Sequence, residues 1–177
     1  MKKIPVAGAI IIRKNEKNEE ELLLIRRSKT DHWGLIWEFP RGKVKIGESI
    51  KKGLLREVKE ETGLDVKIVK FIDKYKYIAD KGTRISTQYN FLCRIINPKQ
   101  EVKLSFEHDE YRWIKTVGEA ELLVPSEMKK TISKVLNDED RIVSYDMENN
   151  TEKIKESIDF YLDKLLRGPI NETIFNN

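Results

Sequence analysis

The chain has 177 residues, a length that fits one domain of ordinary size with a short segment left over. Charged residues make up 36% of the chain and hydrophobic residues 39%, and the apolar runs are too short to span a membrane as helices. The net charge of +4 comes from lysines interleaved with glutamates, a pattern typical of a solvated surface, so it favours anionic ligands only weakly.

Strand-forming runs dominate the first hundred residues. Apolar and alternating segments predict strands over residues 4–13, 22–27, 36–39, 66–78 and 84–96, with the first two forming a hairpin. Ser49 is a favourable helix N-cap and Gly63 a favourable helix end, so the residues between them are predicted to form one helix. Strands with an inserted helix indicate an α/β protein.

The next segments are shorter. "EVKLSF" (101–106) and "YRWIK" (111–115) are predicted to be a further pair of strands. Thr116 and Glu119 have the spacing of a capping box, which predicts a short helix after them. "SEMKKTISKVL" (126–136) has the period of a helix.

The chain is expected to divide into a domain over residues 1–136 and a C-terminal helical extension over residues 137–177. In the extension, residues 151–166 carry an apolar stripe at helical spacing. Such a stripe most often packs on the preceding domain, and a homodimer contact is the alternative.

The N-terminus superficially resembles a secretion signal, because two lysines precede an apolar run. That run ends at Arg13 and no clean cleavage site follows, so a first strand in a cytoplasmic protein is expected. The single cysteine, Cys93, cannot form an internal disulfide and is predicted to be a buried apolar residue.

Three glutamates gather on the predicted helix. Glu57, Glu60 and Glu61 are related as i, i+3 and i+4, so their side chains share one face. Like charges at this spacing repel by about 0.2–0.5 kcal/mol per pair. A divalent cation would remove that cost, and Mg²⁺ prefers carboxylate and phosphate oxygens. The alternative for such a cluster is a plain solvated face.

The surrounding residues complete a longer signature. Gly42 is followed after five residues by Glu48, and after seven more by the unbroken run Arg56–Leu64, "REVKEETGL". This pattern resembles the Nudix box without a mismatch at its defining positions. The resemblance implies an α/β/α sandwich around a mixed sheet, and hydrolysis of a nucleoside diphosphate linked to another group, with Mg²⁺, or Mn²⁺, as cofactor.

The resemblance also implies a metal site. Glu60 and Glu61 match the principal metal ligands of the family. Glu57 matches a third ligand, or the group that orients or deprotonates the attacking water. The backbone carbonyl of Arg41 or Gly42 is expected to be a further ligand.

The resemblance also implies roles for other residues near the box. Arg56 matches an arginine that pins a glutamate by a charge-assisted hydrogen bond, and Glu48 matches an outer partner of the site. Arg41 and Lys43 flank Gly42 and are expected to bind the distal phosphates, with exposed solvated cations as the alternative. Gly53, on the acidic side of the helix, is expected to let a ligand approach the backbone.

Downstream, the loop before the last predicted strand carries further candidates. Glu107 is expected to complete the metal site or to supply the catalytic base. His108 is expected to be polar surface. Tyr111 is a candidate for stacking on a base, whereas Trp113 is expected in the core.

Two motifs point to different substrates. "EHDEYRW" resembles asymmetric diadenosine tetraphosphate hydrolases, whereas "WEFPRGK" is closer to mutator-type nucleoside triphosphate pyrophosphohydrolases. A dinucleoside tetraphosphate is the first expectation and a nucleoside triphosphate the second. An RNA 5′ end is a third substrate to consider, although no basic stripe with interleaved aromatics is evident, and a non-catalytic nucleotide-binding domain is the remaining alternative.

Overall fold

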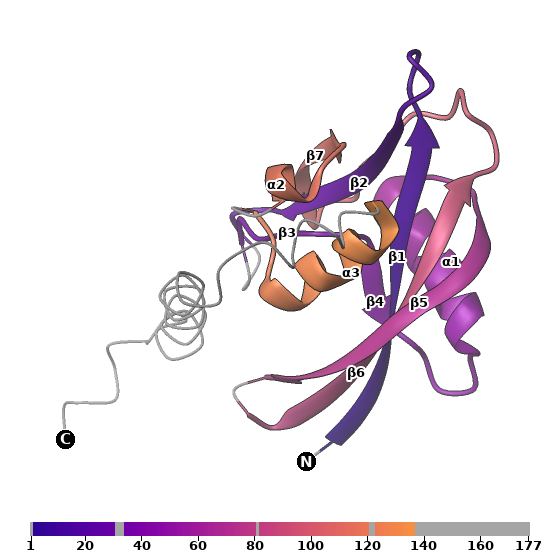
Figure 1. The fold of residues 1–177 in the computed structure, drawn as a ribbon. Coiled ribbons are helices and arrows are strands. Elements are labelled where there is room, and N and C mark those ends of the chain that lie inside the picture. Colours follow the sequence, from indigo (N-terminus) through magenta and orange to yellow (C-terminus); the bar gives the residue numbers. More distant parts are fainter. Residues whose placement is uncertain (1, 31–33, 81, 121–122, 137–177) are drawn as a thin grey trace.

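The computed structural model describes residues 2–30, 34–80, 82–120 and 123–136. Four strands precede the first helix, three more strands follow it, and two helices come last (Figure 1). The strands are β1 (Lys2–Lys14), β2 (Glu20–Arg27), β3 (Trp37–Glu38), β4 (Arg41–Lys43), β5 (Val66–Ala79), β6 (Arg84–Ile95) and β7 (His108–Ile114). The helices are α1 (Ile50–Thr62), α2 (Val117–Ala120) and α3 (Ser126–Leu136).

The strands form one mixed seven-stranded sheet in the order β3-β2-β1-β6-β5, with β4 also pairing with β1 and β7 with β2. β1 runs parallel to β6 and antiparallel to β2 and β4. It pairs with β2 near its end, at Ile12–Lys14, and with β4 near its middle, at Val6–Gly8. The sheet therefore opens around β1, and β4 fills that opening beside α1.

Helices cover both faces of this sheet (Figure 1). The alternation along β2 is clear: Leu23 and Ile25 pack in the cluster under α1, whereas Leu22 and Leu24 pack in the cluster shared with α2 and α3. The molecule is therefore an α/β/α sandwich with a mixed sheet, which confirms the predicted fold.

Most predicted elements are confirmed, including the first hairpin and the bounds of α1. Cys93 is fully buried, as predicted. The predicted strand over residues 101–106 is wrong, because 101–105 lack regular structure and the segment bonds to the end of α1 instead. β4 was missed, because three residues around Gly42 carry no alternating pattern.

The predicted C-terminal extension, residues 137–177, lies outside the described residues. The predicted helix over 151–166 and its packing therefore stay predictions. None of the helices in the part of the chain that the structure describes is long and apolar enough to cross a membrane.

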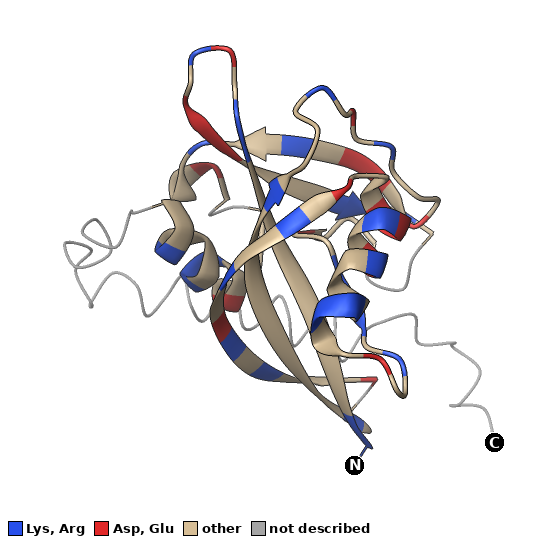
Figure 2. Cartoon of the chain, turned by 90° about the vertical axis from the view of Figure 1, so that its right-hand side faces the viewer, with Lys and Arg blue, Asp and Glu red and all other residues tan. Residues whose placement is uncertain are grey.

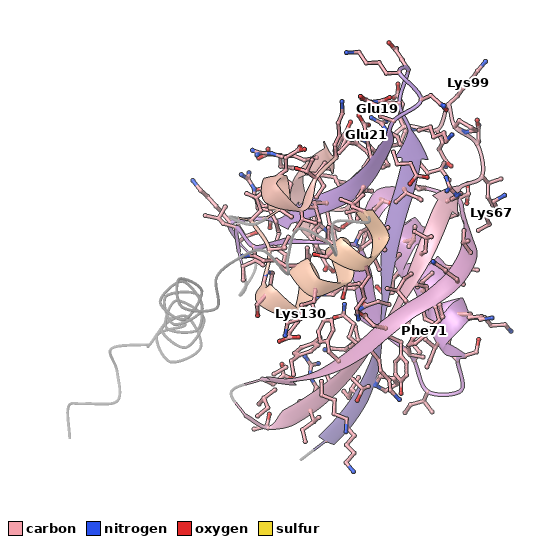
Figure 3. The ribbon with its side chains drawn as sticks, viewed as in Figure 1. Glu19, Glu21, Lys67, Phe71, Lys99 and Lys130 are labelled. Atoms are coloured by element: carbon pink, nitrogen blue, oxygen red, sulfur yellow. The ribbon has the colours of Figure 1, made fainter. Side chains whose placement is uncertain are left out.

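Basic and acidic residues are mixed over the described elements, including α1 and the strands (Figure 2). Many form ion pairs, such as Arg13 with Glu21 at 2.9 Å beside the β1–β2 turn (Figure 3). The interleaved charges of the sequence are thus a mixed, partly paired surface.

Candidate active site

Helix α1 is a fixed platform for the predicted box. The side chain of Ser49 accepts a hydrogen bond from the Lys52 N–H at 3.3 Å, and Gly63 ends the helix in the left-handed region at φ 69°. Leu54 and Val58 are buried against the sheet, whereas Leu55 is 41% exposed. The helix is docked by one stripe, and its acidic edge lies at the rim of that contact, with Glu60 the most exposed of the three glutamates.

The three glutamates differ sharply in burial. The residue Glu61 is 5% exposed, the side chain of Glu57 is 16% exposed and that of Glu60 is 55% exposed. Burial and the nearby charge of Glu38 raise the pKa of Glu61 well above its ordinary value of 4.5. Burial also raises the pKa of Glu57, and the charges of Glu60 and Glu107 add to that rise against the opposing effect of Arg56. The carboxylates thus form a crowded, partly desolvated cluster.

Arg56 is the main cation bonded to this cluster. Its Nη1 donates to Glu57 at 2.7 Å and to Glu60 at 3.1 Å. Its Nε and Nη2 donate to the two oxygens of Glu48, both at 3.0 Å, and Nη2 also donates to the carbonyl of Lys43 at 3.0 Å. The paired hydrogen bonds from Arg56 lower the pKa of Glu48 to about 2. One guanidinium therefore holds three carboxylates and β4 together.

Gly42 lies directly against the catalytic helix. A Cβ built on Gly42 would overlap the carboxyl group of Glu57. The box glycine is therefore needed for close approach of β4 to α1. Gly53 has a different neighbour from the expected ligand: a Cβ there would lie 3.1 Å from Glu48 and 3.2 Å from Val44. The space beside Gly53 belongs to the protein's own side chains.

Arg41 and Lys43, the two residues predicted to bind phosphate, lie in different surroundings. The backbone N–H of Arg41 donates to Glu61 at 2.9 Å, while its guanidinium donates to Glu38 at 2.6 Å, Gln88 at 2.9 Å and the Tyr77 hydroxyl at 3.1 Å. Lys43 is exposed. Arg41 is therefore committed to internal contacts, and Lys43 is the better placed of the two to meet a phosphate.

Glu38 is a functional candidate that sequence reasoning missed. It is completely buried between Arg27, whose Nε lies 2.7 Å away, and Arg41. Burial alone would raise the pKa of Glu38, but these arginines and His108 lower it to about 2. The sequence carries no clear signal for it, because a charged residue between Trp37 and Phe39 is the ordinary alternation of a strand with one polar face.

His108 is not polar surface. It is the first residue of β7, is 5% exposed, and places Nε2 3.7 Å from Glu38 and Nδ1 3.4 Å from the hydroxyl of Ser105. The expectation failed because His108 is not a loop residue: it begins β7 and pairs with Arg27 of β2. His108 belongs to the buried polar group around Glu38.

Glu107 and the loop before it lie beside the acidic face. The N–H of Lys103 donates to the carbonyl of Thr62 at 2.8 Å, and the N–H of Ser105 donates to the carbonyl of Glu61 at 3.1 Å. Glu107 follows, exposed, and its charge acts on Glu57. The tertiary structure thus brings Glu107 to the box, from which it is separated by more than forty residues of chain.

The two aromatic candidates lie on β7. Tyr111 pairs with Ile25 of β2 and is 43% exposed, so its ring is open to solvent. Trp113 is partly buried against the cluster under α1, with the Arg13 guanidinium 4.0 Å from its ring centre. Tyr111 can therefore meet a ligand, whereas Trp113 is mainly a packing residue.

The donor set suits a hard divalent cation, since it consists of carboxylate oxygens. Within the described ranges, however, no three acidic, histidine or cysteine side chains form a group that could hold a metal ion. Glu57 and Glu60 turn toward Arg56 instead. These residues can hold a metal ion if Glu57 and Glu60 each give up a hydrogen bond to Arg56 and bind the cation instead.

Comparison with known proteins agrees with this geometry. Residues 2–135 match the family model described as the NUDIX domain. The asymmetrical bis(5'-nucleosyl)-tetraphosphatase of Mus musculus is 30% identical over 126 residues, which cover 69% of this chain and 82% of that protein.

Two solved structures are similar in fold. A C. elegans Ap4A hydrolase in a binary complex has a TM-score of 0.64 and 27% identity, over 75% of this chain and 94% of that one. The MutT protein from Methanosarcina mazei Go1 has a TM-score of 0.60 and 29% identity, over 75% of this chain and 92% of that one.

The fold, the complete box and the family match together establish the class: the chain belongs to the NUDIX family. It is a pyrophosphohydrolase that acts on phosphoanhydride bonds. Enzymes of this family generally use divalent metal ions.

Proposed function

We propose that this protein is a Mg²⁺-dependent hydrolase of nucleotides that carry a polyphosphate chain, with a dinucleoside tetraphosphate as the first substrate. On diadenosine tetraphosphate the products would be ATP and AMP. The observation that carries this proposal is the placement of Glu57, Glu60 and Glu61 along one edge of α1, beside a loop that contributes Glu107.

Mg²⁺, or Mn²⁺ in its place, would be held by Glu57, Glu60 and Glu61. Either Arg41 or Gly42 could add a backbone carbonyl, and the register favours Arg41. Gly42 pairs with Ala7 between the bonds from Ala9 to Pro40 and from Val44 to Pro5, so its polar groups face β1. Those of Arg41 point to the other edge of β4, where its N–H meets Glu61.

The cation would lower the pKa of bound water and neutralise phosphate charge. Glu57 is the first candidate to orient that water or to take its proton, because Arg56 and the close approach of Gly42 fix its carboxyl group at the acidic face. Glu107 is the second candidate. Arg56 orients Glu57 through its 2.7 Å hydrogen bond and is a positioning residue. Glu48 fixes Arg56 in turn.

The choice of substrate depends on which of the two motifs, "WEFPRGK" or "EHDEYRW", reports on substrate binding. "WEFPRGK" favoured a nucleoside triphosphate, but Glu38 and Arg41 of that motif pair with each other inside the protein. The contact between these two residues inside the protein is enough to explain why they occur in this motif. The motif is therefore weaker support for a nucleoside triphosphate substrate. "EHDEYRW" leaves Glu107 and Tyr111 exposed, and it agrees with similarity to a tetraphosphatase. Dinucleoside tetraphosphate therefore leads, with nucleoside triphosphate as the alternative.

Product analysis tests the proposal. The full chain with Mg²⁺ is incubated with diadenosine tetraphosphate, the common nucleoside triphosphates, ADP-ribose and a triphosphorylated RNA. ATP plus AMP from the first, at the highest kcat/KM, is the expected result. Monophosphate plus pyrophosphate from a triphosphate, with the dinucleotide intact, would replace it with the alternative.

Glu60→Gln protein purified in parallel is the matched control, because contaminating phosphatases would survive that change. RNA turnover that falls steeply between low and high salt would instead indicate a nucleic-acid substrate. Whether the chain forms a homodimer is a separate question, which sedimentation of the full chain answers.

A further inference from the structure

A small cavity adjoins the acidic face of α1. Its volume is about 120 Å³, and its walls are Ser28, Thr30, Phe106 and Glu107. Two of these residues come from the end of β2 and the loop after it, and two from the loop before β7. Only Glu107 was singled out from the sequence, and the box supplies none of the four.

Phe106 is the unusual member of this set. It is 91% exposed, which leaves almost its entire ring in water. Exposed apolar residues are common, but this one sits on a loop whose backbone is fixed. The preceding Ser105 donates its N–H to the carbonyl of Glu61 at 3.1 Å, and the N–H of His108 donates to the carbonyl of Ser105 at 3.1 Å.

The opposite wall is equally well fixed. The N–H of Ser28 donates to the carbonyl of Glu107 at 2.9 Å, which ties the end of β2 to the loop before β7. The hydroxyls of Ser28 and Thr30 lie 3.0 Å apart. The cavity therefore combines one aromatic face, two hydroxyls and one carboxylate on a held backbone.

Charge indicates which part of a nucleotide suits this cavity. Phe106 and Glu107 follow Ser105, whose N–H donates to the carbonyl of Glu61, so the cavity lies near the end of α1 that carries the acidic face. Glu107 is the charged residue among these four described residues, so the wall that they form favours a neutral group over a phosphate. A neutral planar ring with polar edges fits these walls, because it can stack on Phe106 while its edge or the ribose meets the hydroxyls.

We propose that Ser28, Thr30 and Phe106 form a nucleoside subsite, in which the nucleobase of the substrate stacks on Phe106. The inference rests on the proposed function, because it takes the substrate to be a nucleotide. Phe106 is then a specificity-determining residue that favours nucleotides over polyphosphates without a base. Stacking tolerates any base, so a preference for aromatic rings in general is expected.

The test compares Phe106→Ala with the unaltered full chain on diadenosine tetraphosphate and Mg²⁺. The KM is expected to rise about 10-fold, within the range that stacking of one base contributes, while kcat changes less than twofold. Phe106→Tyr should restore the KM because it keeps the ring. Phe106→Leu should not, because it keeps bulk without an aromatic face.

A base-free inhibitor separates stacking from general damage. Inorganic tetraphosphate should inhibit Phe106→Ala and the unaltered chain with the same Ki, whereas the Ki of AMP should rise with the KM. Phe71→Ala is the matched control, because Phe71 is a half-exposed phenylalanine on β5, far along the chain from the cavity (Figure 3).

An unchanged KM and AMP Ki in Phe106→Ala, with normal turnover, would overturn the subsite and leave the proposed function standing. Equal increases in the Ki values of AMP and tetraphosphate would also overturn it, because the loss would not depend on a base. If the unaltered chain cleaves none of the nucleotides, the proposed function fails first, and the subsite with it.

Discussion

The carboxyl group of Glu57 occupies the space in which a side chain at residue 42 would begin, so Gly42 and Glu57 depend on each other. Gly42 is not among the described residues that have a positive φ angle. The requirement for glycine is therefore steric and comes from helix α1 rather than from the turn.

Gly42→Ala should displace Glu57 and lower kcat/KM by about 100-fold, because a small misplacement of a catalytic group is costly. Circular dichroism should show that the fold is kept. Gly118→Ala is the control, since a Cβ there meets only the Thr116 hydroxyl at 3.7 Å. Wild-type activity in Gly42→Ala would mean that Glu57 can move aside without loss.

Glu60→Gln should lower activity by about 10³-fold, because a proposed metal ligand loses its charge. The stability of the metal-free protein should change by less than about 0.5 kcal/mol, since the side chain is half exposed and Arg56 keeps Glu57 and Glu48. Urea unfolding in the presence of a chelator measures this change in stability. Activity within about tenfold of the unaltered chain would contradict the assigned role.

The pairing of Glu48 with Arg56 should make stability depend on pH. The pKa of Glu48 is lowered from 4.5 to about 2, chiefly by hydrogen bonds from Arg56, so the folded state favours its charged form. This stabilisation is present above pH 4.5 and is lost as the pH falls toward 2. The difference in urea midpoint between the unaltered chain and Glu48→Gln should therefore shrink between pH 6 and pH 3. A difference that stays constant would show that the charge of Glu48 is not what stabilises the site.

Arg41 and Lys43 should separate cleanly into a structural and a binding residue. Arg41→Ala should lower the free energy of unfolding by about 3 kcal/mol, because the buried carboxylate of Glu38 loses one of its arginines. Lys43→Ala should leave stability unchanged and raise the KM several-fold. Thermal unfolding and steady-state kinetics on both variants provide the measurements. Full stability in Arg41→Ala would return that residue to the phosphate-binding role expected from the sequence.

The fold and helix α1 were predictable because their signals are local. Ser49 and Gly63 mark the ends of α1, and the spacing of Glu57, Glu60 and Glu61 places them on one face by helix geometry alone. β4 and the loop over residues 101–105 were not predictable in the same way. Their conformation depends on hydrogen bonds to β1 and to the end of α1 rather than on their own pattern.

The sequence by itself determined the family, the acidic face and the residues that form the box. Only the tertiary structure decided what Arg41, Glu38 and His108 do. Arg41 meets Tyr77 and Gln88, which lie 36 and 47 residues further along the chain. No period in the sequence reports contacts at such separation, because they depend on how β4, β5 and β6 pair in the sheet. The pairing of β3 and β7 with β2 likewise buries the charge of Glu38 beside His108, and the bond from Ser105 to Glu61 sets the loop with the exposed Phe106 near the end of α1.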